Sequence, residues 1–375
     1  MQPAGGNPKY DVIVVGASFA GLGAATELNG LNVLLIDRKE IGTHVTSACG
    51  TPLRFLEETG LQSAVLQNHK VFIFHLGDRK YSFPLPEAFA TFDYMELCQQ
   101  LAKQGAAKFL KTSALEMTDR SVKTTAGTFE ADFVIDATGW KGLSLKEERP
   151  PIQKLATALE SEVAESNPEG LHFMVRTQRS PGCFWLFPAG PHTRYGLGEY
   201  VGGDKIKPKL VDFMDSYKQA PHEFHGNIIR TDFRVPIQNG IFLAGESAGH
   251  CVPMSYEGIR PSIYFGKAAG RIISAIHRGQ LPREEGIALY SSFVKKHWKV
   301  WVVLGRLEWM VFHLPMWSVG LVFKFLKRPD RWDRIFYRYI HAFSLTRLEN
   351  HLGYLKPSAP TPISPLRKEE TLVAV

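Results

Sequence analysis

A glycine-containing turn between a short apolar strand and a helix is the feature that most constrains how this chain can fold. Residues 10–16, YDVIVVG, are rich in β-branched side chains and end at glycine, and helix-forming residues follow from 20 to 29. A second apolar run, 33–36, ends at Asp37. This order predicts a strand–helix–strand unit, which implies two parallel strands of one sheet joined by a right-handed crossover.

The turn itself has the pattern of a phosphate-binding loop. Residues 16–21, GASFAG, form a G-x-S-x-x-G variant of the dinucleotide fingerprint. Gly16 permits the tight turn, Gly21 lets helix and strand approach, and the helix N-terminus offers free N–H groups to a pyrophosphate. Asp37 lies 21 residues after Gly16, where a carboxylate accepts ribose hydroxyls. The predicted dinucleotide contacts are Gly16, Ala17, Ser18, Ala20, Gly21, Asp37 and Arg38.

Later segments suggest that the same sheet is assembled from several parts of the chain. Residues 133–136 are a buried-strand run that leads to Gly139, and 241–244 repeat the pattern before Gly245. Between them, 171–176 and 195–200 alternate as antiparallel strands do, and 282–349 are helical in pattern. With 375 residues, 44% hydrophobic and 22% charged, the chain is long enough for two to three lobes and too apolar to be disordered.

The stretch after position 240 carries a family resemblance. Residues 242–260 read FLAGESAGHCVPMSYEGIR. There the chain resembles the flavoprotein group of geranylgeranyl reductases, aromatic-ring hydroxylases, flavin halogenases and lycopene cyclases, over about 8–280. The resemblance implies FAD on a three-segment α/β domain of Rossmann type, an inserted antiparallel sheet over the flavin, and a helix N-terminus at the flavin ring. It adds these residues to the expected FAD site: Cys49, Gly139, Gly245, Glu246, Gly249, Gly258 and Ile259.

Within that group the chain most resembles the geranylgeranyl reductases. Residues 183–188, CFWLFP, are similar to the Y-x-W-x-F-P signature that lines the prenyl channel, and 48–54, ACGTPLR, are similar to a Cys-Gly stretch of those enzymes. Glu246 stands where the group usually has Asp, and Phe184 is one place off the expected Tyr. The alternative for the aromatic motif is an ordinary strand core. The resemblance implies substrate contacts by Phe184, Trp185, Phe187 and Pro188.

The expected domains follow from these segments. We predict a discontinuous FAD-binding domain, an inserted substrate domain, a C-terminal helical region and a proline-containing flexible tail. Their ranges are 8–67, 91–149 and 236–282 for FAD; 68–90 and 150–235 for substrate; 283–350 for the helices; and 351–375 for the tail.

The implied activity is reduction of isoprenoid carbon–carbon double bonds by hydride transfer from reduced FAD. The alternatives are an FAD-dependent hydroxylase or epoxidase, a non-redox use of reduced flavin as in lycopene cyclases, and a flavin-binding protein without turnover. A halogenase is disfavoured because, of its Trp-x-Trp-x-Ile-Pro element, only one tryptophan has a counterpart, Trp185. The proton donor stays open among solvent, Cys49, His250 and Tyr256, and the external electron donor stays open between NADPH and ferredoxin.

Charge and tryptophan are concentrated at the C-terminal end. Residues 1–290 hold 30 Lys/Arg and 31 Asp/Glu, whereas 291–375 hold 14 and 6, with five of the seven Trp. We therefore expect 291–350 to contact an anionic membrane surface peripherally, and the alternative is that these helices only cap the substrate lobe. Nucleic acid is disfavoured because no recognition motif accompanies the charge. Charged residues and a proline interrupt the apolar stretch 300–323, which argues against a simple span.

The cysteines and the N-terminus bear on the compartment. Cys49, Cys98, Cys183 and Cys251 lie far apart without metal-ligand spacing, so we expect no disulfide framework and no metal site. The first ten residues lack the apolar segment of a secretory signal. We expect reduced thiols in the cytoplasm, with the protein peripheral on the inner face of the membrane. The sequence does not indicate an oligomeric state.

Overall fold

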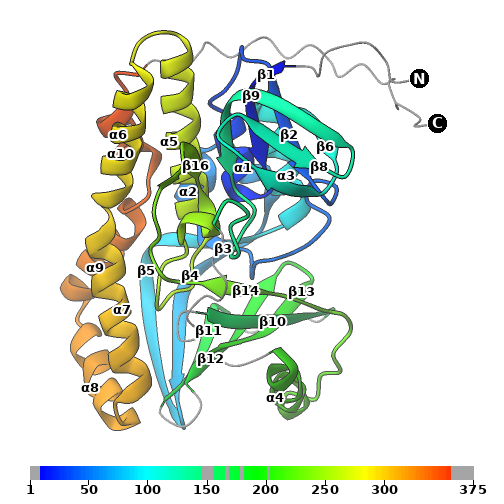
Figure 1. Cartoon of the computed structure of the whole chain (residues 1–375). Coiled ribbons are helices and arrows are strands. Elements are labelled where there is room, and N and C mark those ends of the chain that lie inside the picture. Colours follow the sequence, from blue (N-terminus) through cyan, green and yellow to red (C-terminus); the bar gives the residue numbers. More distant parts are fainter. Residues whose placement is uncertain (1–8, 146–154, 165–168, 178–180, 201–202, 356–375) are drawn as a thin grey trace.

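Two eight-stranded sheets and a column of helices make up the molecule (Figure 1). The computed structural model describes residues 9–145, 155–164, 169–177, 181–200 and 203–355. The first sheet and its helices lie above the second sheet in Figure 1, and the C-terminal helices run along one side of both. This mixed α/β architecture with an inserted sheet and a helical C-terminal region confirms the predicted fold class.

The first sheet contains the predicted strand–helix–strand unit. Its strands follow the order β15-β16-β9-β1-β2-β6, and the pairs β16–β9, β9–β1, β1–β2 and β2–β6 are all parallel. Their carboxyl ends therefore meet at one edge of the sheet. The bounds are β1 Lys9–Val15, β2 Val33–Asp37, β6 Lys108–Lys111, β9 Gly127–Asp136, β15 Ile237–Gln238 and β16 Ile241–Leu243, with β7 Ala114–Met117 and β8 Ser121–Thr124 joined through β9.

Two helices far apart in the sequence pack together against this sheet. Helix α1 (Phe19–Ala25) lies on α5 (Ile259–His277) at backbone distance, since a Cβ added at Gly266 would lie 2.2 Å from the Ala20 carbonyl oxygen. A Cβ at Gly270 would lie 2.3 Å from the carbonyl oxygen of Ala24. Glycine on α5 thus fixes the close approach that sets the N-terminus of α5 beside the glycine turn.

The remaining short elements of this part of the chain are α2 (Leu53–Glu58), the 3-10 turns Gln62–Ala64 and Gly245–Ala248, and α3 (Tyr94–Gln104). Helix α3 begins where the Asp93 carboxylate accepts a hydrogen bond from the Glu96 N–H at 2.8 Å.

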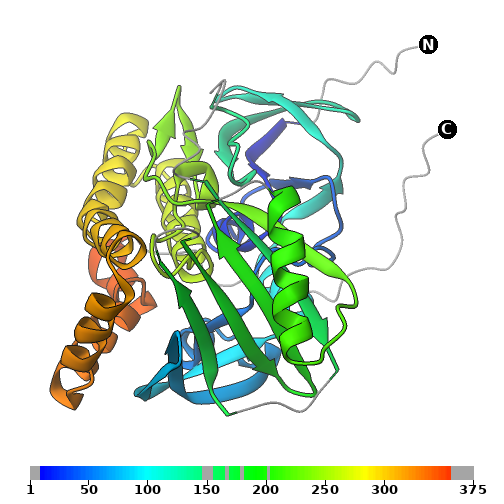
Figure 2. The ribbon, with the colours of Figure 1, turned by 90° about the horizontal axis from the view of Figure 1, so that it is seen from below.

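The second sheet has the order β14-β10-β13-β12-β11-β4-β5-β3 and is antiparallel except for the parallel pair β4–β11. One face is covered by α4 (Gly203–Ser216), which Figure 2 shows lying across the strands. The bounds are β3 Gly50–Pro52, β4 Val65–Leu76, β5 Arg79–Phe92, β10 Leu155–Val163, β11 Leu171–Arg176, β12 Gly182–Ala189, β13 His192–Glu199 and β14 Phe224–Arg230.

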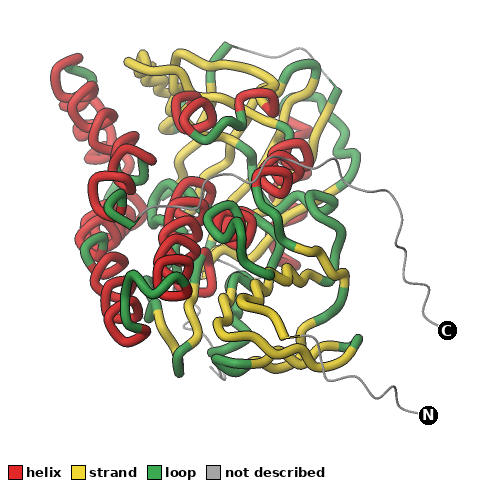
Figure 3. Tube along the Cα trace, turned by 90° about the horizontal axis from the view of Figure 1, so that it is seen from above, coloured by secondary structure: helices red, strands yellow, loops and turns green. Residues whose placement is uncertain are grey.

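The helical column packs against both sheets, as Figures 1 and 3 show from two directions. Tyr290, Phe293 and Trp301 join the core around α5, whereas Phe323 and Phe336 pack on the second sheet. No helix among the described residues is long and apolar enough to span a bilayer. The bounds are α6 Arg283–Lys295, α7 Trp298–His313, α8 Met316–Leu326, α9 Pro329–His341 and α10 Leu345–Leu352.

Two of the expected domain limits are wrong. Gly50–Pro52 pairs with the end of β5, and β4 begins at Val65, so parts of the expected FAD segment 8–67 belong to the second sheet. The reason is that β5 is 14 residues long and continues to Phe92. The last residues of β5 therefore extend far enough to pair with the three-residue strand β3. The expected tail also begins too early, since Leu352 ends α10 and Leu355 is buried; residues 356–375 lie outside the described residues.

Candidate functional site

The glycine turn leaves no room for side chains at its two glycines. Gly16 has φ of 110°, and a Cβ there would lie 2.1 Å from the Ala137 carbonyl oxygen. A Cβ at Gly21 would lie 1.8 Å from the Gly16 carbonyl oxygen. The Ser18 hydroxyl shares a 2.9 Å hydrogen bond with Tyr94 and does not cap α1, so the first N–H groups of that helix face the turn without a side-chain cap. The turn therefore presents backbone N–H groups, as a pyrophosphate requires.

The Asp37 carboxylate is fixed beside the turn. One oxygen accepts a hydrogen bond from the Ala17 N–H at 2.8 Å, and the other accepts from the Lys39 N–H at 3.0 Å. Asp37 ends β2 next to the end of β1, so the two predicted features of the fingerprint share one edge of the sheet. Arg38 follows on the exposed side. This arrangement fits a ribose whose hydroxyls donate to the carboxylate.

The second and third segments of the expected site reach the same edge. Buried Asp136 ends β9, and its carboxylate accepts hydrogen bonds from Thr138 at 2.7 Å and from the Ser247 hydroxyl at 3.1 Å. Gly139 follows with φ of 91°, and Gly245 has φ of 70° with a would-be Cβ 2.7 Å from the Ala20 Cβ. The cradle thus consists of backbone from three segments, which fits a dinucleotide better than it fits a packed core.

The 245–250 loop places two titratable groups beside this cradle. Desolvation raises the pKa of the Glu246 carboxyl to about 8, so at neutral pH it carries a proton and is a hydrogen-bond donor. His250 is fully buried, its Nδ1 accepts from the Gly245 N–H at 3.2 Å, and its ring lies 4.0 Å from that of Phe265. Burial lowers the pKa of His250 well below its usual range. A neutral imidazole packed in this way does not fit the role of proton donor considered for it.

Of the other two candidate proton donors, Cys49 is buried and Tyr256 is partly buried. Cys49 has φ of 54°, its thiol donates to the Ser47 carbonyl oxygen at 3.1 Å, and burial raises its pKa to about 12, so it is a thiol and not a thiolate. Tyr256 has φ of 49° and lies beside Tyr200, with ring centroids 6.1 Å apart. Burial raises the pKa of Tyr256 well above its usual range. Neither group is poised to titrate near neutral pH.

Three further expected cofactor residues lie around the N-terminus of α5. Gly258 precedes Ile259, the first residue of this 19-residue helix, and Ile259 is buried. A Cβ at Gly258 would find the Cys251 sulfur at 3.8 Å, an ordinary contact. Gly249, with φ of 68°, is more demanding, since a Cβ there would lie 1.7 Å from the Asp232 carbonyl oxygen. Glycine at 249 is therefore required by the backbone turn.

The predicted substrate residues separate onto two faces of the second sheet. Trp185 and Phe187 lie on the face toward the helical column. Phe184 lies on the opposite face, where its ring stacks on Phe213 of α4 with centroids 4.3 Å apart. Phe184 therefore cannot share a contact surface with Trp185 and Phe187, because successive residues of a strand point to opposite sides. Pro188 contributes a carbonyl oxygen that accepts from the Thr91 hydroxyl at 2.7 Å.

Around Trp185 and Phe187 the sheet face is aromatic. We call this group, together with the α8 and α9 side chains packed on it, the aromatic cluster. Phe187 lies edge to face with Phe173, with centroids 5.2 Å apart, and Ala48 also packs on the cluster, so it extends to the segment before Cys49. Sequence reasoning missed most of its members, although the alternation along β4, β5 and β11 was visible. They are Phe72, Phe74, Tyr81, Phe83, Phe89, Phe173, Val319, Phe323, Trp332, Phe336 and Ile340.

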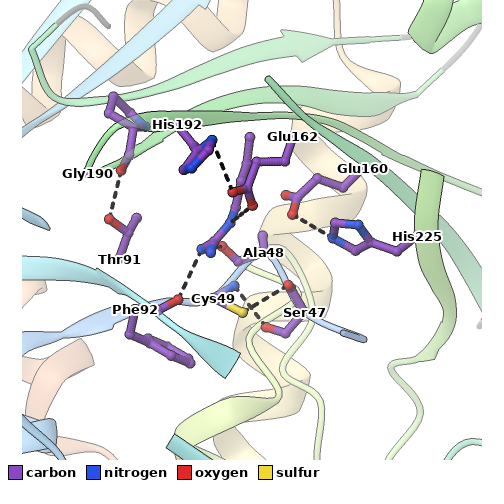
Figure 4. Close-up of polar contacts among 12 residues, drawn as sticks. Ser47, Ala48, Cys49, Thr91, Phe92, Glu160, Glu162, Gly190, His192 and His225 are labelled. Carbon is purple, nitrogen blue, oxygen red and sulfur yellow. Dashed lines mark hydrogen bonds and ion pairs between the residues drawn. The ribbon is translucent and has the colours of Figure 1, made fainter. Parts of the chain in front are cut away.

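A polar group next to the aromatic cluster was also missed. The Trp185 indole lies over Gly196, where a Cβ would meet the ring at 2.0 Å, and its Nε1 donates to Glu160 at 2.5 Å. Arg194 donates to Glu162 at 3.1 Å and to the Phe92 carbonyl oxygen at 3.2 Å. Figure 4 shows Glu160 and Glu162 on the side of the sheet that faces Ser47, Ala48 and Cys49. Gly196 was the one feature of the sequence that indicated this contact, because a glycine within a strand often marks a place where another group packs closely on the backbone.

Comparison with known proteins agrees with this geometry. No family model matches the chain. It is 28% identical to a digeranylgeranylglycerophospholipid reductase of Methanosarcina acetivorans over 77% of this chain and 80% of that protein. It is 24% identical to digeranylgeranylglycerophospholipid reductase 3 of Methanosphaera stadtmanae over 77% and 83%.

Solved structures share the fold. A geranylgeranyl bacteriochlorophyll reductase-like protein from Thermoplasma acidophilum superposes with a TM-score of 0.75 at 19% identity, covering 92% of this chain and 99% of that one. A flavin-dependent brominase superposes with a TM-score of 0.73 at 13% identity, covering 90% and 95%.

The fold, the backbone cradle and these relatives together define the chain as an FAD-dependent oxidoreductase. Within this class the chain resembles the geranylgeranyl reductase family.

Proposed function

We propose that this protein reduces carbon–carbon double bonds of an isoprenoid lipid. The observation that carries the proposal is the aromatic cluster, which borders the Ala48 segment at one end and continues between the second sheet and α8 and α9. A chain of isoprene units is wholly apolar, and the edge of this packed cluster beside the Ala48 segment offers apolar side chains that such a chain can contact. The names of the two archaeal relatives support the same substrate class.

In this proposal the chain's own residues bind, orient and exclude water. The backbone of the glycine turn and Asp37 hold the pyrophosphate and ribose, and the uncharged Glu246 carboxyl donates to a ribitol hydroxyl. The N-terminus of α5 stabilises negative charge on the reduced ring. Bound FAD in its reduced form supplies a hydride. Trp185 and Phe187 hold the alkene in place and keep water away from it.

The fate of reduced enzyme tests this activity. In the absence of oxygen, adding geranylgeraniol to the reduced holoenzyme should reoxidise the flavin and yield a product heavier by two hydrogen atoms. In air, the reductase should still give this product. If the flavin is reoxidised only when oxygen is present, and the product gains an oxygen atom, the protein is a monooxygenase and the proposal is wrong.

We also propose that α7 and α8 rest on an anionic membrane, where such a substrate is dissolved. Exposed apolar side chains on these helices include Trp309, Trp317 and Phe325, with 59%, 66% and 58% of their surface accessible. Lys324 on α8 and Lys327 directly after it accompany them. Aromatic rings at the headgroup level and basic side chains near anionic lipids are both favourable at an interface.

A further inference from the structure

We propose that Glu160 is the acid that protonates the substrate carbon, and that His225 returns a proton to it from solvent. This inference rests on the proposed function, because it assigns the proton that double-bond reduction requires. The proposal starts from the neighbouring strands β10, β13 and β14, which place both side chains on one face of the second sheet.

The first step of the argument is which face these residues occupy. On β10, Leu159 and Val163 point toward α4, so Glu160 and Glu162 point the other way. His225 is the cross-strand neighbour of Glu160, on that same face. It is the face toward Ala48 and Cys49, which the Arg194 guanidinium confirms by donating to the Ala48 carbonyl oxygen at 3.4 Å.

The second step is how Glu160 is held. The Glu160 side chain is 4% exposed. One carboxyl oxygen accepts a hydrogen bond from the Trp185 indole N–H, and the other lies 3.0 Å from His225 Nε2. Glu162, two residues on, differs because it pairs with the permanently charged Arg194 and is 36% exposed. A histidine can pass a proton to the carboxyl that it contacts, whereas an arginine cannot.

The third step is the route of the proton. The His225 side chain is 23% exposed and Glu160 is buried, so the pair leads from solvent to the interior. Trp185 packs on the aromatic cluster and donates a hydrogen bond to Glu160. The Glu160 carboxyl therefore lies between the aromatic cluster and the segment that contains Cys49. The charged and titratable groups around the pair are His44, Cys49, Glu162, His192 and Arg194.

The chemical step balances with the reductant already proposed. The Glu160 O–H bond breaks and its proton forms a C–H bond with one alkene carbon, using the π electron pair. The other carbon receives the hydride, so the alkene gains two electrons and the reduced flavin loses two. The Glu160 carboxylate then takes a proton from His225 Nε2, and His225 takes one from water. General acids positioned in this way contribute roughly a hundredfold to ten-thousandfold in rate.

The test uses the holoenzyme and four variants. Glu160→Gln keeps the size and still accepts from Trp185 but cannot give up a proton, and Glu162→Gln is the matched control on the same strand and face. Trp185→Phe removes the hydrogen bond while keeping an aromatic ring, and His225→Asn removes the relay. Flavin content and thermal unfolding establish that each variant is folded and loaded.

The first readout needs no substrate. A downfield imidazole N–H proton resonance, assigned to His225 by its loss in His225→Asn, should persist in Glu162→Gln and shift or disappear in Glu160→Gln. If Glu160→Gln leaves this resonance unchanged, the pair does not exchange a proton and the assignment is overturned.

The second readout is single-turnover oxidation of the reduced flavin by geranylgeraniol without oxygen. Glu160→Gln should be at least a hundredfold slower, Trp185→Phe about tenfold slower and Glu162→Gln within threefold of wild type. All should reduce ferricyanide at the wild-type rate, since that acceptor takes no proton on carbon. A wild-type rate in Glu160→Gln overturns the assignment alone. Failure of the wild type to react with geranylgeraniol overturns the proposed function and the assignment together.

Discussion

The two sheets of this molecule would offer different parts of the chain to a ligand. The carboxyl edge of the first sheet presents backbone, at glycines where a Cβ would collide with a carbonyl oxygen or a neighbouring side chain. The facing side of the second sheet presents side chains, aromatic at one end and charged at the other. A site made of backbone tolerates almost no substitution at its glycines. In a site made of side chains, a single substitution changes which ligand is preferred and leaves the other contacts in place. The difference predicts which mutations abolish function and which only redirect it.

The largest effect is expected at the first sheet. Gly16→Val should remove bound FAD completely, because a branched side chain would occupy the position 2.1 Å from the Ala137 carbonyl oxygen. The visible absorption of the purified protein measures this. Gly279→Ala is the control, since Gly279 also has a positive φ, 70°, but nothing lies within 4 Å of its would-be Cβ. If the purified Gly16→Val protein is yellow and holds a full complement of FAD, the glycine turn is not the FAD-binding site.

The second sheet should respond by losing turnover before it loses cofactor. Trp185→Ala is expected to retain FAD and to lower the rate with a long prenyl substrate at least tenfold, because the indole lies over Gly196 beside the aromatic cluster. Phe184→Ala, one residue away on the α4 face, should instead lower the free energy of unfolding by roughly 3 kcal/mol with turnover kept. If Trp185→Ala unfolds or loses FAD, the residue is only part of a core.

A smaller effect is expected where the helical column meets the membrane. Replacing Trp309, Trp317 and Phe325 by alanine should weaken co-sedimentation with anionic vesicles without changing FAD content. Binding of the wild type should also fall as salt rises, since each basic side chain near the surface contributes about 1 kcal/mol that salt screens. Leu115→Ala, exposed on β7, is the control. No binding of the wild type to anionic vesicles at low salt would leave these helices only a capping role.

The smallest effect concerns the Glu246 carboxyl, whose pKa is raised to about 8. Between about pH 4.5 and pH 8 the folded protein holds a proton here that the unfolded chain releases, so this group makes stability fall as pH rises. Glu246→Gln should flatten that part of the stability profile, measured by denaturant unfolding of the apoprotein. If the free energy of unfolding changes with pH in the same way in wild type and variant, the Glu246 carboxyl is not desolvated.

The same contrast explains what the sequence revealed. The βαβ unit, the glycine turn and Asp37 were predictable because their order and spacing are local, and the fold class is confirmed. The pairing of Glu160 with His225 was not, because 65 residues separate them and only the β10–β14 register brings them together. The separation of Phe184 from Trp185 was missed for a related reason: the motif grouped neighbouring residues, but a strand presents only alternate ones to a given side.

The contact between α1 and α5 has a consequence for how the protein is made. Lys267 and Arg271 pair with Glu27 at 3.2 and 3.0 Å across 240 and 244 positions of sequence. During synthesis the first helix therefore leaves the ribosome long before its partner exists, with its glycine and alanine face uncovered. Native contacts this distant in sequence slow folding and prolong exposure to aggregation. We expect the cofactor cradle to close only after residue 277 has emerged, so FAD would bind only once α5 has been made.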